Sequence, residues 1–146
     1  MGQELRDLLE SIDGVQQDPV WHPEGDALFH SLQVFQHAQR HSNDRELWAA
    51  ALLHDVGKGL GAHHELEGAA MLRSLMPERV TWLVEHHLDL LRAPTRTRRK
   101  LRGSPRLRDL EQLRRWDVAG RDPNASVGSV AEAVEAIMEV ALQVST

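Results

Sequence analysis

Apolar residues recur every three or four positions along most of the chain, and this period is typical of amphipathic helices. Between positions 26 and 41, for example, the apolar stripe consists of Leu28, Leu32, Phe35 and Ala38. No segment shows the sustained apolar–polar alternation that indicates a strand. We therefore predict an all-α protein that forms a single compact bundle of about six to seven helices.

Capping residues and prolines define where these helices begin and end. Asp26 and Asn43 are expected to cap the second and third helices, Ser104-Pro105 to start a long one, and Pro94 to close the fifth. A short basic helix is expected at 95–101. The other predicted helices span residues 4–12, 26–41, 44–56, 65–75, 78–91, 105–120 and 129–144. The helical periodicity also predicts core positions for the tryptophans, which are Trp21, Trp48, Trp82 and Trp116.

Composition narrows the possible chemistry. The 146 residues fit one domain, 1–146, with no repeat or low-complexity linker. The absence of cysteine excludes disulfides, thiolate metal sites and thiol nucleophiles, so any metal must bind His, Asp or Glu. No leader segment and no run of about 18 apolar residues is present, so we expect a cytoplasmic protein without a membrane partner. A net charge of −5 disfavours general nucleic-acid binding, although residues 92–108 hold eight basic residues and no acidic one.

The segment 51–58, Ala-Leu-Leu-His-Asp-Val-Gly-Lys, places His54 and Asp55 side by side near the end of a predicted helix. Adjacent side chains on a helix diverge by about 100°, yet they can converge on a cation at the helix end. Further histidines lie on other predicted helices, and facing helices of a bundle build metal sites from inward side chains. Nitrogen and oxygen donors suit divalent Mn, Fe, Mg, Co, Ni or Zn without distinguishing among them.

The order His30, then His54-Asp55, then Asp117 resembles the H…HD…D pattern of the HD-domain superfamily of metal-dependent phosphohydrolases. Segments 21–30 and 116–122 are similar to the HD domain of some bacterial tRNA nucleotidyltransferases, although no nucleotidyltransferase domain is recognised in this sequence. The resemblance implies a helical bundle of the HD-domain type, with a motif-bearing core at about 21–122 and the helix at 129–144 packing on it.

The resemblance also implies a ligand set for one or two divalent ions. The first ion would be held by His30, His54, Asp55 and Asp117. The second would share Asp55 as a bridge, with His64 and either His86 or His87. Of the last two we prefer His86, with His87 as an alternative or an additional ligand. Asp55 and Lys58 are the expected catalytic residues, since an ammonium group beside the metals would stabilise phosphate charge.

The activity implied is hydrolysis of a phosphomonoester or phosphodiester by a metal-activated hydroxide, and we expect a small phosphorylated substrate such as a nucleotide. Arg98, Arg99 and Arg102 in the basic run are expected to bind substrate phosphate, which also leaves a nucleic-acid end as a partner. The alternative for this run is a solvated helix face. Two other functions stay open: an HD-fold di-iron oxygenase, and a non-catalytic nucleotide-binding HD module.

Overall fold

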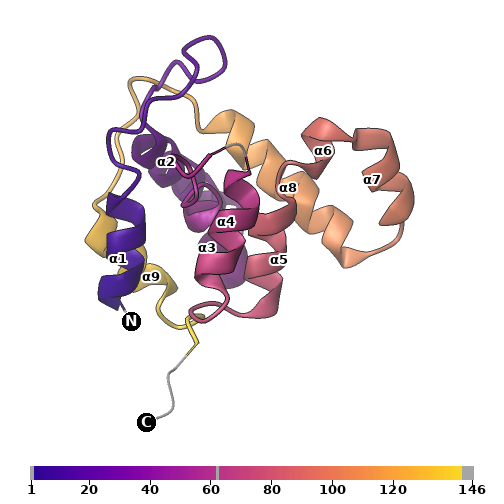
Figure 1. The fold of residues 1–146 in the computed structure, drawn as a ribbon. Coiled ribbons are helices and arrows are strands. Elements are labelled where there is room, and N and C mark those ends of the chain that lie inside the picture. Colours follow the sequence, from indigo (N-terminus) through magenta and orange to yellow (C-terminus); the bar gives the residue numbers. More distant parts are fainter. Residues whose placement is uncertain (1, 62, 143–146) are drawn as a thin grey trace.

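The computed structural model describes residues 2–61 and 63–142, and in these ranges the chain forms nine α-helices and no strand (Figure 1). The all-α prediction is confirmed, with slightly more helices than expected. The helices are α1 (Gly2–Glu10), α2 (Ala27–His41), α3 (Arg45–Leu53), α4 (His64–Leu72), α5 (Glu78–His86), α6 (Asp89–Arg92), α7 (Pro94–Lys100), α8 (Pro105–Ala119) and α9 (Val130–Ile137). None of the described helices has the length and apolar character needed to cross a bilayer.

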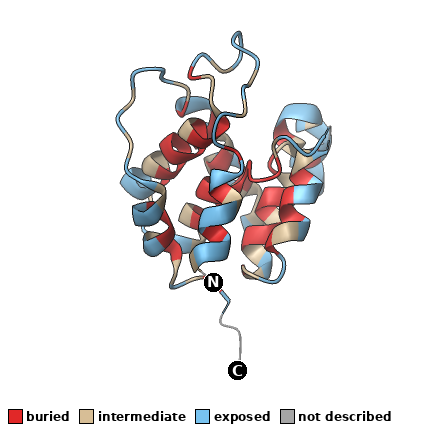
Figure 2. Cartoon of the chain, turned by 60° about the vertical axis from the view of Figure 1, so that its left-hand side comes forward, coloured by how far each residue is buried: buried red, intermediate tan, exposed pale blue. Residues whose placement is uncertain are grey.

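Helix α3 lies in the middle of the bundle, where it packs against α2, α5, α8 and α9. Its second half, residues 49–53, is Ala-Ala-Ala-Leu-Leu, and all five residues are fully buried. Small alanine side chains let neighbouring helices approach closely, and the two leucines fill the remaining space. Buried segments of the helices face one another across the interior (Figure 2). The residues that follow α3 therefore emerge inside the bundle.

Two of the predicted helix starts are confirmed and one is wrong. The Asp26 carboxylate accepts a hydrogen bond from the Phe29 amide at 3.1 Å, and Ser104 caps α8 in the same manner. The predicted cap Asn43 is replaced by its neighbour Asp44, whose carboxylate accepts from the amides of residues 46 and 47. Both residues have side chains suited to capping, so the sequence did not separate them.

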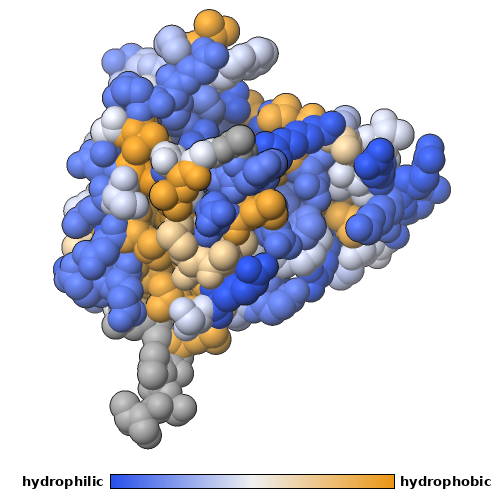
Figure 3. All heavy atoms as spheres, viewed as in Figure 1, coloured by the Kyte–Doolittle hydropathy of each residue, from blue (hydrophilic) through white to orange (hydrophobic). Residues whose placement is uncertain are grey.

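The predicted single helix over 78–91 is wrong. Helix α5 ends at His86, and α6 follows as a separate short helix. In a continuing helix the Val84 carbonyl would accept from the amide of residue 88, but here it accepts from the ring Nδ1 of His87 at 2.7 Å. Pro94 does not close a helix but opens α7, because the first helical position does not need an amide donor. Helices α6 and α7 form an arm beside α8 that is largely hydrophilic (Figures 1 and 3).

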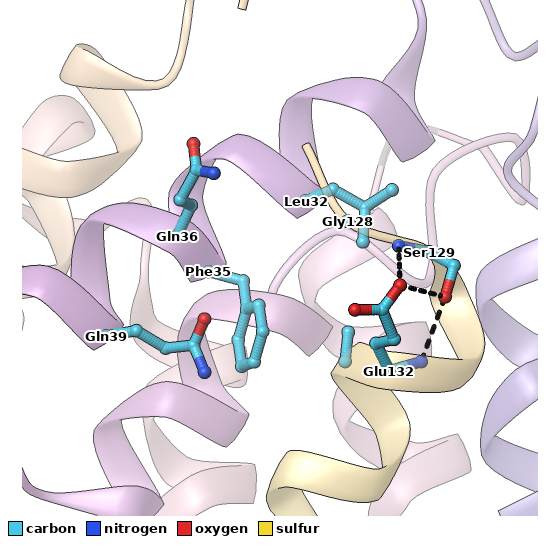
Figure 4. A pocket seen from close by; sticks show the side chains of 8 residues that line it. Leu32, Phe35, Gln36, Gln39, Gly128, Ser129 and Glu132 are labelled. Atoms are coloured by element: carbon cyan, nitrogen blue, oxygen red, sulfur yellow. Dashed lines mark hydrogen bonds between the residues drawn. The ribbon is translucent and has the colours of Figure 1, made fainter. Parts of the chain in front are cut away.

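The last helix is shorter than predicted, since α9 ends at Ile137 instead of 144, and residues 143 and 144 lie outside the described part of the chain. Its start is a capping box. Ser129 Oγ accepts from the Glu132 amide at 3.1 Å, while the Glu132 carboxylate reaches back to the Ser129 amide (Figure 4). Leu32 and Phe35 of α2 line a hollow of about 220 Å³ beside this cap. The capping box fixes where α9 begins against α2.

The core prediction for the tryptophans is correct for three of them. Trp116 is buried, and Trp48 and Trp82 are half-buried against the core. Trp21 contradicts the prediction, because it lies in the loop between α1 and α2 with 65% of its surface exposed. Residue 21 lies outside the predicted helices, so helical periodicity gave no support for a core position there.

Arg79 on α5 connects this helix to α3 and α8 through hydrogen bonds. Its guanidinium makes two hydrogen bonds to the Asp109 carboxylate of α8, at 2.9 and 3.0 Å, and also bonds Asp44 and Glu46 at the start of α3. The hydrogen bond with Asp109 is the main reason that the pKa of Arg79 is raised above its ordinary value, against the smaller opposing effect of burial. A paired, planar fork of this kind holds helices in a fixed relative position.

We expect Arg79→Ala to lower the free energy of unfolding by about 1–2 kcal/mol, since it leaves three carboxylates without their common partner at a partly exposed site. Urea denaturation followed by circular dichroism measures the change. Arg73→Ala is the matched control, because Arg73 makes one exposed ion pair with Glu85 and should change stability by less than about 0.5 kcal/mol. Equal losses in the two variants would contradict the structural role of Arg79.

Candidate metal centre

Five helices deliver imidazoles and carboxylates to one buried point in the bundle. His54 and Asp55 follow the end of α3, and the remaining residues come from α2, α4, α8 and the end of α5. Four of the six side chains are buried almost completely, and only His64 reaches 14% exposure. The six residues of this cluster are His30, His54, Asp55, His64, His87 and Asp117.

The carboxylate of Asp55 lies between two pairs of histidines. Its Oδ2 atom is 3.2 Å from Nε2 of His54 and 3.8 Å from Nε2 of His30. Its Oδ1 atom is 3.4 Å from Nε2 of His64 and 3.5 Å from Nε2 of His87. Each oxygen therefore faces a different pair of ring nitrogens.

Asp117 lies close to only one of these two pairs of histidines. Its Oδ1 atom lies 2.8 Å from Nε2 of His30 and 3.5 Å from Nε2 of His54. We call the donor set of His30, His54, Asp55 and Asp117 site A, and the set of Asp55, His64 and His87 site B. The two sets share only Asp55.

Hydrogen bonds on the far side of the rings orient three of the histidines. Nδ1 of His30 donates to the Gly120 carbonyl at 2.8 Å, and Nδ1 of His54 and of His87 donate to the carbonyls of residues 51 and 84 at 2.7 Å. A carbonyl only accepts, so each Nδ1 carries the proton and, in the neutral ring, each Nε2 presents its lone pair to the cluster. Such outer hydrogen bonds are characteristic of metal-binding histidines.

Two ring nitrogens without a hydrogen-bond partner indicate that a cation fits this cluster. Nε2 of His54 and Nε2 of His64 are both buried and have no hydrogen-bond partner among the described residues. Buried polar atoms without a partner are rare and costly in folded proteins. Both atoms point toward Asp55, so a cation bound beside this carboxylate would satisfy them, and the donor set fits divalent metals.

The charge state of the cluster favours a cation as well. Burial alone would raise the pKa of Asp55, but the positive charge of His54 and the close ring nitrogens of His54, His64 and His87 hold that pKa well below its usual range. Burial is likewise outweighed at Asp117, whose pKa is lowered by a hydrogen bond from His30 and by the nearby ring of His54. For His54, burial is outweighed by the charge of Asp55 and the nearby carboxylate of Asp117, so its pKa is raised well above normal. Two ionised carboxylates in the interior require positive charge beside them, which protons or metal ions can supply.

The structure places His87 in the cluster and His86 outside it. Nδ1 of His86 lies 2.8 Å from Asp89, and its ring stacks on Trp82 at 4.4 Å between centroids. A sequence signal for this difference exists, because the buried residues Val80, Leu83 and Val84 of α5 continue with helical spacing to position 87. Position 86 instead shares a face with Trp82. Helix α5 therefore offers His87 to site B rather than the preferred His86.

The remaining predicted residues lie around the cluster or away from it. Lys58, half-buried, donates a hydrogen bond from Nζ to Oε1 of Gln17 at 2.8 Å. Arg98, Arg99 and Arg102 are exposed on α7 and the turn after it, and the structure gives them no contact with the cluster. Their binding to a substrate phosphate stays a prediction.

One acidic and one basic neighbour of the cluster, Glu24 and His22, were not among the predicted site residues. Glu24 has a fully buried side chain whose Oε1 atom is 2.8 Å from Nδ1 of His22 and 3.9 Å from Nδ1 of His30. Because Nδ1 of His30 is occupied by the Gly120 carbonyl, Glu24 does not form another metal site with these rings, and its hydrogen bond orients the ring of His22. Burial lowers the pKa of His22, against the hydrogen bond with Glu24. Both residues lie in the segment 21–30, and the similarity of this segment to the HD domain of some bacterial tRNA nucleotidyltransferases could have identified them.

Gly57 allows the segment that follows Asp55 to lie close to the start of α4, which carries His64. A Cβ atom at this position would overlap the His64 carbonyl and lie 2.8 Å from the Gly68 amide nitrogen. Only glycine therefore permits the chain after Asp55 to pass directly against the first turn of α4. This contact brings His64 to Asp55.

A cleft of about 620 Å³ borders the cluster. We call it the Trp21 cleft, and six of its wall residues are Gln17, Trp21, Lys58, Leu91, Arg114 and Arg121. His22, also in the wall, has its ring 5.1 Å from that of His30, and Nη1 of Arg114 lies 3.5 Å from Asp117. The cleft therefore opens beside site A.

The chain belongs to the HD domain family, whose model matches residues 28–136, and thus to a superfamily of metal-dependent phosphohydrolases. It is 36% identical over 81 residues to the multifunctional CCA protein of Hahella chejuensis, covering 50% of this chain and 19% of that protein. The corresponding protein of Acinetobacter baumannii is 36% identical over 97 residues, or 64% of this chain and 23% of its own length.

A further relative is the bifunctional uridylyltransferase/uridylyl-removing enzyme of Rhodospirillum rubrum, 44% identical over 57 residues, which cover 33% of this chain and 6% of the relative. This chain spans less than a quarter of the length of each of these three relatives. The resemblance to an HD domain is thereby confirmed.

We expect two divalent ions per chain, and substitution of cluster residues should change this number stepwise. His64→Ala or His87→Ala should leave about one ion, because site A stays intact, and Asp55→Ala should remove most of both, because each site loses a ligand. Elemental analysis of protein purified without added metal gives the count, with circular dichroism to confirm helical content.

The controls for this count are neighbouring histidines outside the cluster. His63→Ala, at a side chain that is 72% exposed, and His86→Ala should both retain two ions. A loss of metal in His86→Ala with full retention in His87→Ala would reverse the assignment on α5. The same metal content in every variant would rule out the two-ion cluster.

Proposed function

We propose that this chain hydrolyses a phosphomonoester or phosphodiester bond of a nucleotide with divalent cations held by sites A and B. The observation that carries the proposal is the position of Asp55, whose two carboxylate oxygens face two separate pairs of histidine nitrogens. A carboxylate in this position is suited to bridge two cations. Membership of the HD domain family supports the same chemistry.

Divalent cations bound here would supply Lewis acidity, lowering the pKa of a water molecule and offsetting negative charge on the phosphoryl group. The protein contributes a prearranged donor set. Among the described residues, site B offers three protein donors, which leaves room for water or substrate at that position. Asp55 and Asp117 remain ionised near neutral pH because their pKa values are depressed.

Positive side chains in the Trp21 cleft support a phosphorylated substrate. Lys58 and Arg114 lie in its wall, and Arg114 also reaches Asp117. In this position their charges would hold a phosphate beside site A and stabilise negative charge that develops on its oxygens. The volume of the cleft is within the roughly 300–1,000 Å³ typical of small-molecule sites.

The name of one relative supports the choice of a nucleotide. The Rhodospirillum rubrum protein is named a uridylyl-removing enzyme, and a uridylyl group is a nucleotide attached through its phosphate. The shared region includes only a small part of that protein, so we transfer the class of bond and not the particular substrate.

We expect protein stripped by a chelator to regain hydrolysis of at least one nucleotide phosphoester when a divalent cation is restored. The measurement is release of phosphate or nucleoside from a panel of 2′-, 3′- and 5′-nucleotides and cyclic and linear diesters, with each of the six candidate cations. Asp55→Ala should abolish turnover, and His86→Ala should keep it, since His86 lies outside the cluster. Wild-type turnover in Asp55→Ala would overturn the proposal. Absence of hydrolysis with every cation, together with aerobic substrate oxidation by the iron-loaded protein, would assign the site to the oxygenase alternative.

Replacing Arg98, Arg99 and Arg102 together with alanine should raise KM for the nucleotide more than it lowers kcat. Charged contacts away from the reacting phosphorus are shared by the ground state and the transition state, so their loss mainly weakens binding. Arg40→Ala, an exposed arginine at the end of α2, is the control for a general loss of positive charge. An unchanged KM would identify residues 98–102 as a solvated helix face.

A further inference from the structure

Trp21 presents a large aromatic surface to the Trp21 cleft. Its side chain is 65% exposed, whereas tryptophan is highly buried on average. Leu91 of α6, in the same wall, is 55% exposed. An aromatic face and an aliphatic side chain in one cleft form a surface on which a flat apolar group can pack.

Two buried hydrogen-bond donors in the cleft wall have no partner. Nε2 of Gln17 and Nε of Arg121 are both inaccessible to solvent and lack an acceptor among the described residues. The amide orientation of Gln17 is fixed, because its Oε1 accepts from Nζ of Lys58 at 2.8 Å and the reversed amide would set two donors against each other. A buried donor without an acceptor is costly. A small shift of either side chain toward the cleft, which would expose the nitrogen to an acceptor oxygen of a ligand, is therefore favoured when that ligand is bound.

The charge of the wall defines the ligand further. Lys58, Arg114 and Arg121 all line the cleft. The carboxylate in the same wall, that of Asp18, accepts a hydrogen bond from the Val20 amide at 2.9 Å. The wall therefore combines an apolar surface, positive charge and free donors, and the ligand that matches this combination is an anion with a flat aromatic part.

We propose that the Trp21 cleft binds the nucleoside part of the substrate, with Trp21 stacking on the base and with Gln17 and Arg121 donating to oxygens of the same nucleotide. This inference rests on the proposed function and adds to it the residues that select a nucleotide over other phosphate esters. The reacting phosphate then lies at the side of the cleft where Arg114 meets Asp117, while the base lies toward the loop between α1 and α2.

Isothermal titration of AMP and adenosine tests the stacking residue. Trp21→Ala should raise Kd for both by about 5- to 100-fold, the range of a lost base–aromatic stack, and Trp21→Phe should restore most of the affinity. Leu66→Ala is the control, because Leu66 is an exposed apolar residue of α4 outside the cleft wall. Equal AMP affinity in wild type and Trp21→Ala would overturn the inference.

Two conservative changes test the donors. Gln17→Glu keeps an acceptor for Lys58 and removes the free amide donor, and Arg121→Lys keeps the charge and removes Nε. Each should raise Kd for AMP by about tenfold. If neither change alters the affinity, the donors do not contact the nucleotide and this part of the inference fails.

The failure of this inference and the failure of the proposed function can be told apart. Adenosine has no phosphate, so its binding to Asp55→Asn, measured with and without the Trp21 substitution, reports on the cleft independently of metal and turnover. Trp21-dependent binding without hydrolysis of any ester would support the cleft assignment and overturn the proposed function. Hydrolysis of ribose 5-phosphate as efficient as that of AMP, and equally reduced by Trp21→Ala, would overturn the inference and leave the proposed function intact. A wild-type dimer that Trp21→Ala converts to a monomer would assign the cleft to a second copy of the chain and overturn the inference.

Discussion

Burial of the Asp55 carboxylate is the constraint around which the bundle is arranged. An ionised carboxylate in a protein interior is strongly unfavourable unless opposite charge and hydrogen bonds compensate it. Here the compensation comes from four histidines on four different segments, which reach both carboxylate oxygens. The helices must therefore pack so that these rings converge, and the buried second half of α3 places Asp55 where they can do so.

The rings themselves are fixed by the backbone around them. The carbonyls of residues 51, 84 and 120 each accept a ring Nδ1 hydrogen, so the orientation of an imidazole depends on where a helix ends. Gly120 is also closely approached, since a Cβ atom there would lie 2.7 Å from a methyl group of Val34 and 3.1 Å from its amide nitrogen. Helix ends and close glycine contacts thus determine the positions of the donor atoms, which is a more rigid arrangement than one built on loops.

The cleft beside the cluster is built differently. Trp21 and Gln17 lie in the loop between α1 and α2, and Leu91 lies on the four-residue helix α6. Such segments tolerate sequence change more readily than the helices of the core do. The metal donors and the residues that face the rest of the substrate are therefore carried by separate parts of the fold, so the identity of the substrate can change while the donor set is retained.

Much of the fold follows from the sequence because helix formation depends on local order. Helical periodicity predicts α2, α3 and α8 closely, since a helix in a bundle must present one apolar side. The order His30, then His54-Asp55, then Asp117 resembles the HD-domain pattern, and this resemblance implied the four donors that lie together as site A. We expected His86 rather than His87 to face Asp55, although the apolar spacing of α5 continues to position 87. The two side chains point about 100° apart, and the rotation of α5 against its neighbours turns His87 toward Asp55.

Packing between distant parts of the chain decided those features of the fold and the site that the sequence did not predict. Contacts between residues far apart in the chain, such as Lys58 with Gln17 and Arg92 with Glu65, hold the loop between α1 and α2 and the helix α6 in place beside the core. Local propensity carries no information about such pairs. The sequence by itself thus determined which residue types can bind a metal and in which order they occur. Only the tertiary structure decided which nitrogen faces which oxygen, because a donor set is defined within a few ångströms and helix rotation alone can displace a side chain by more than that.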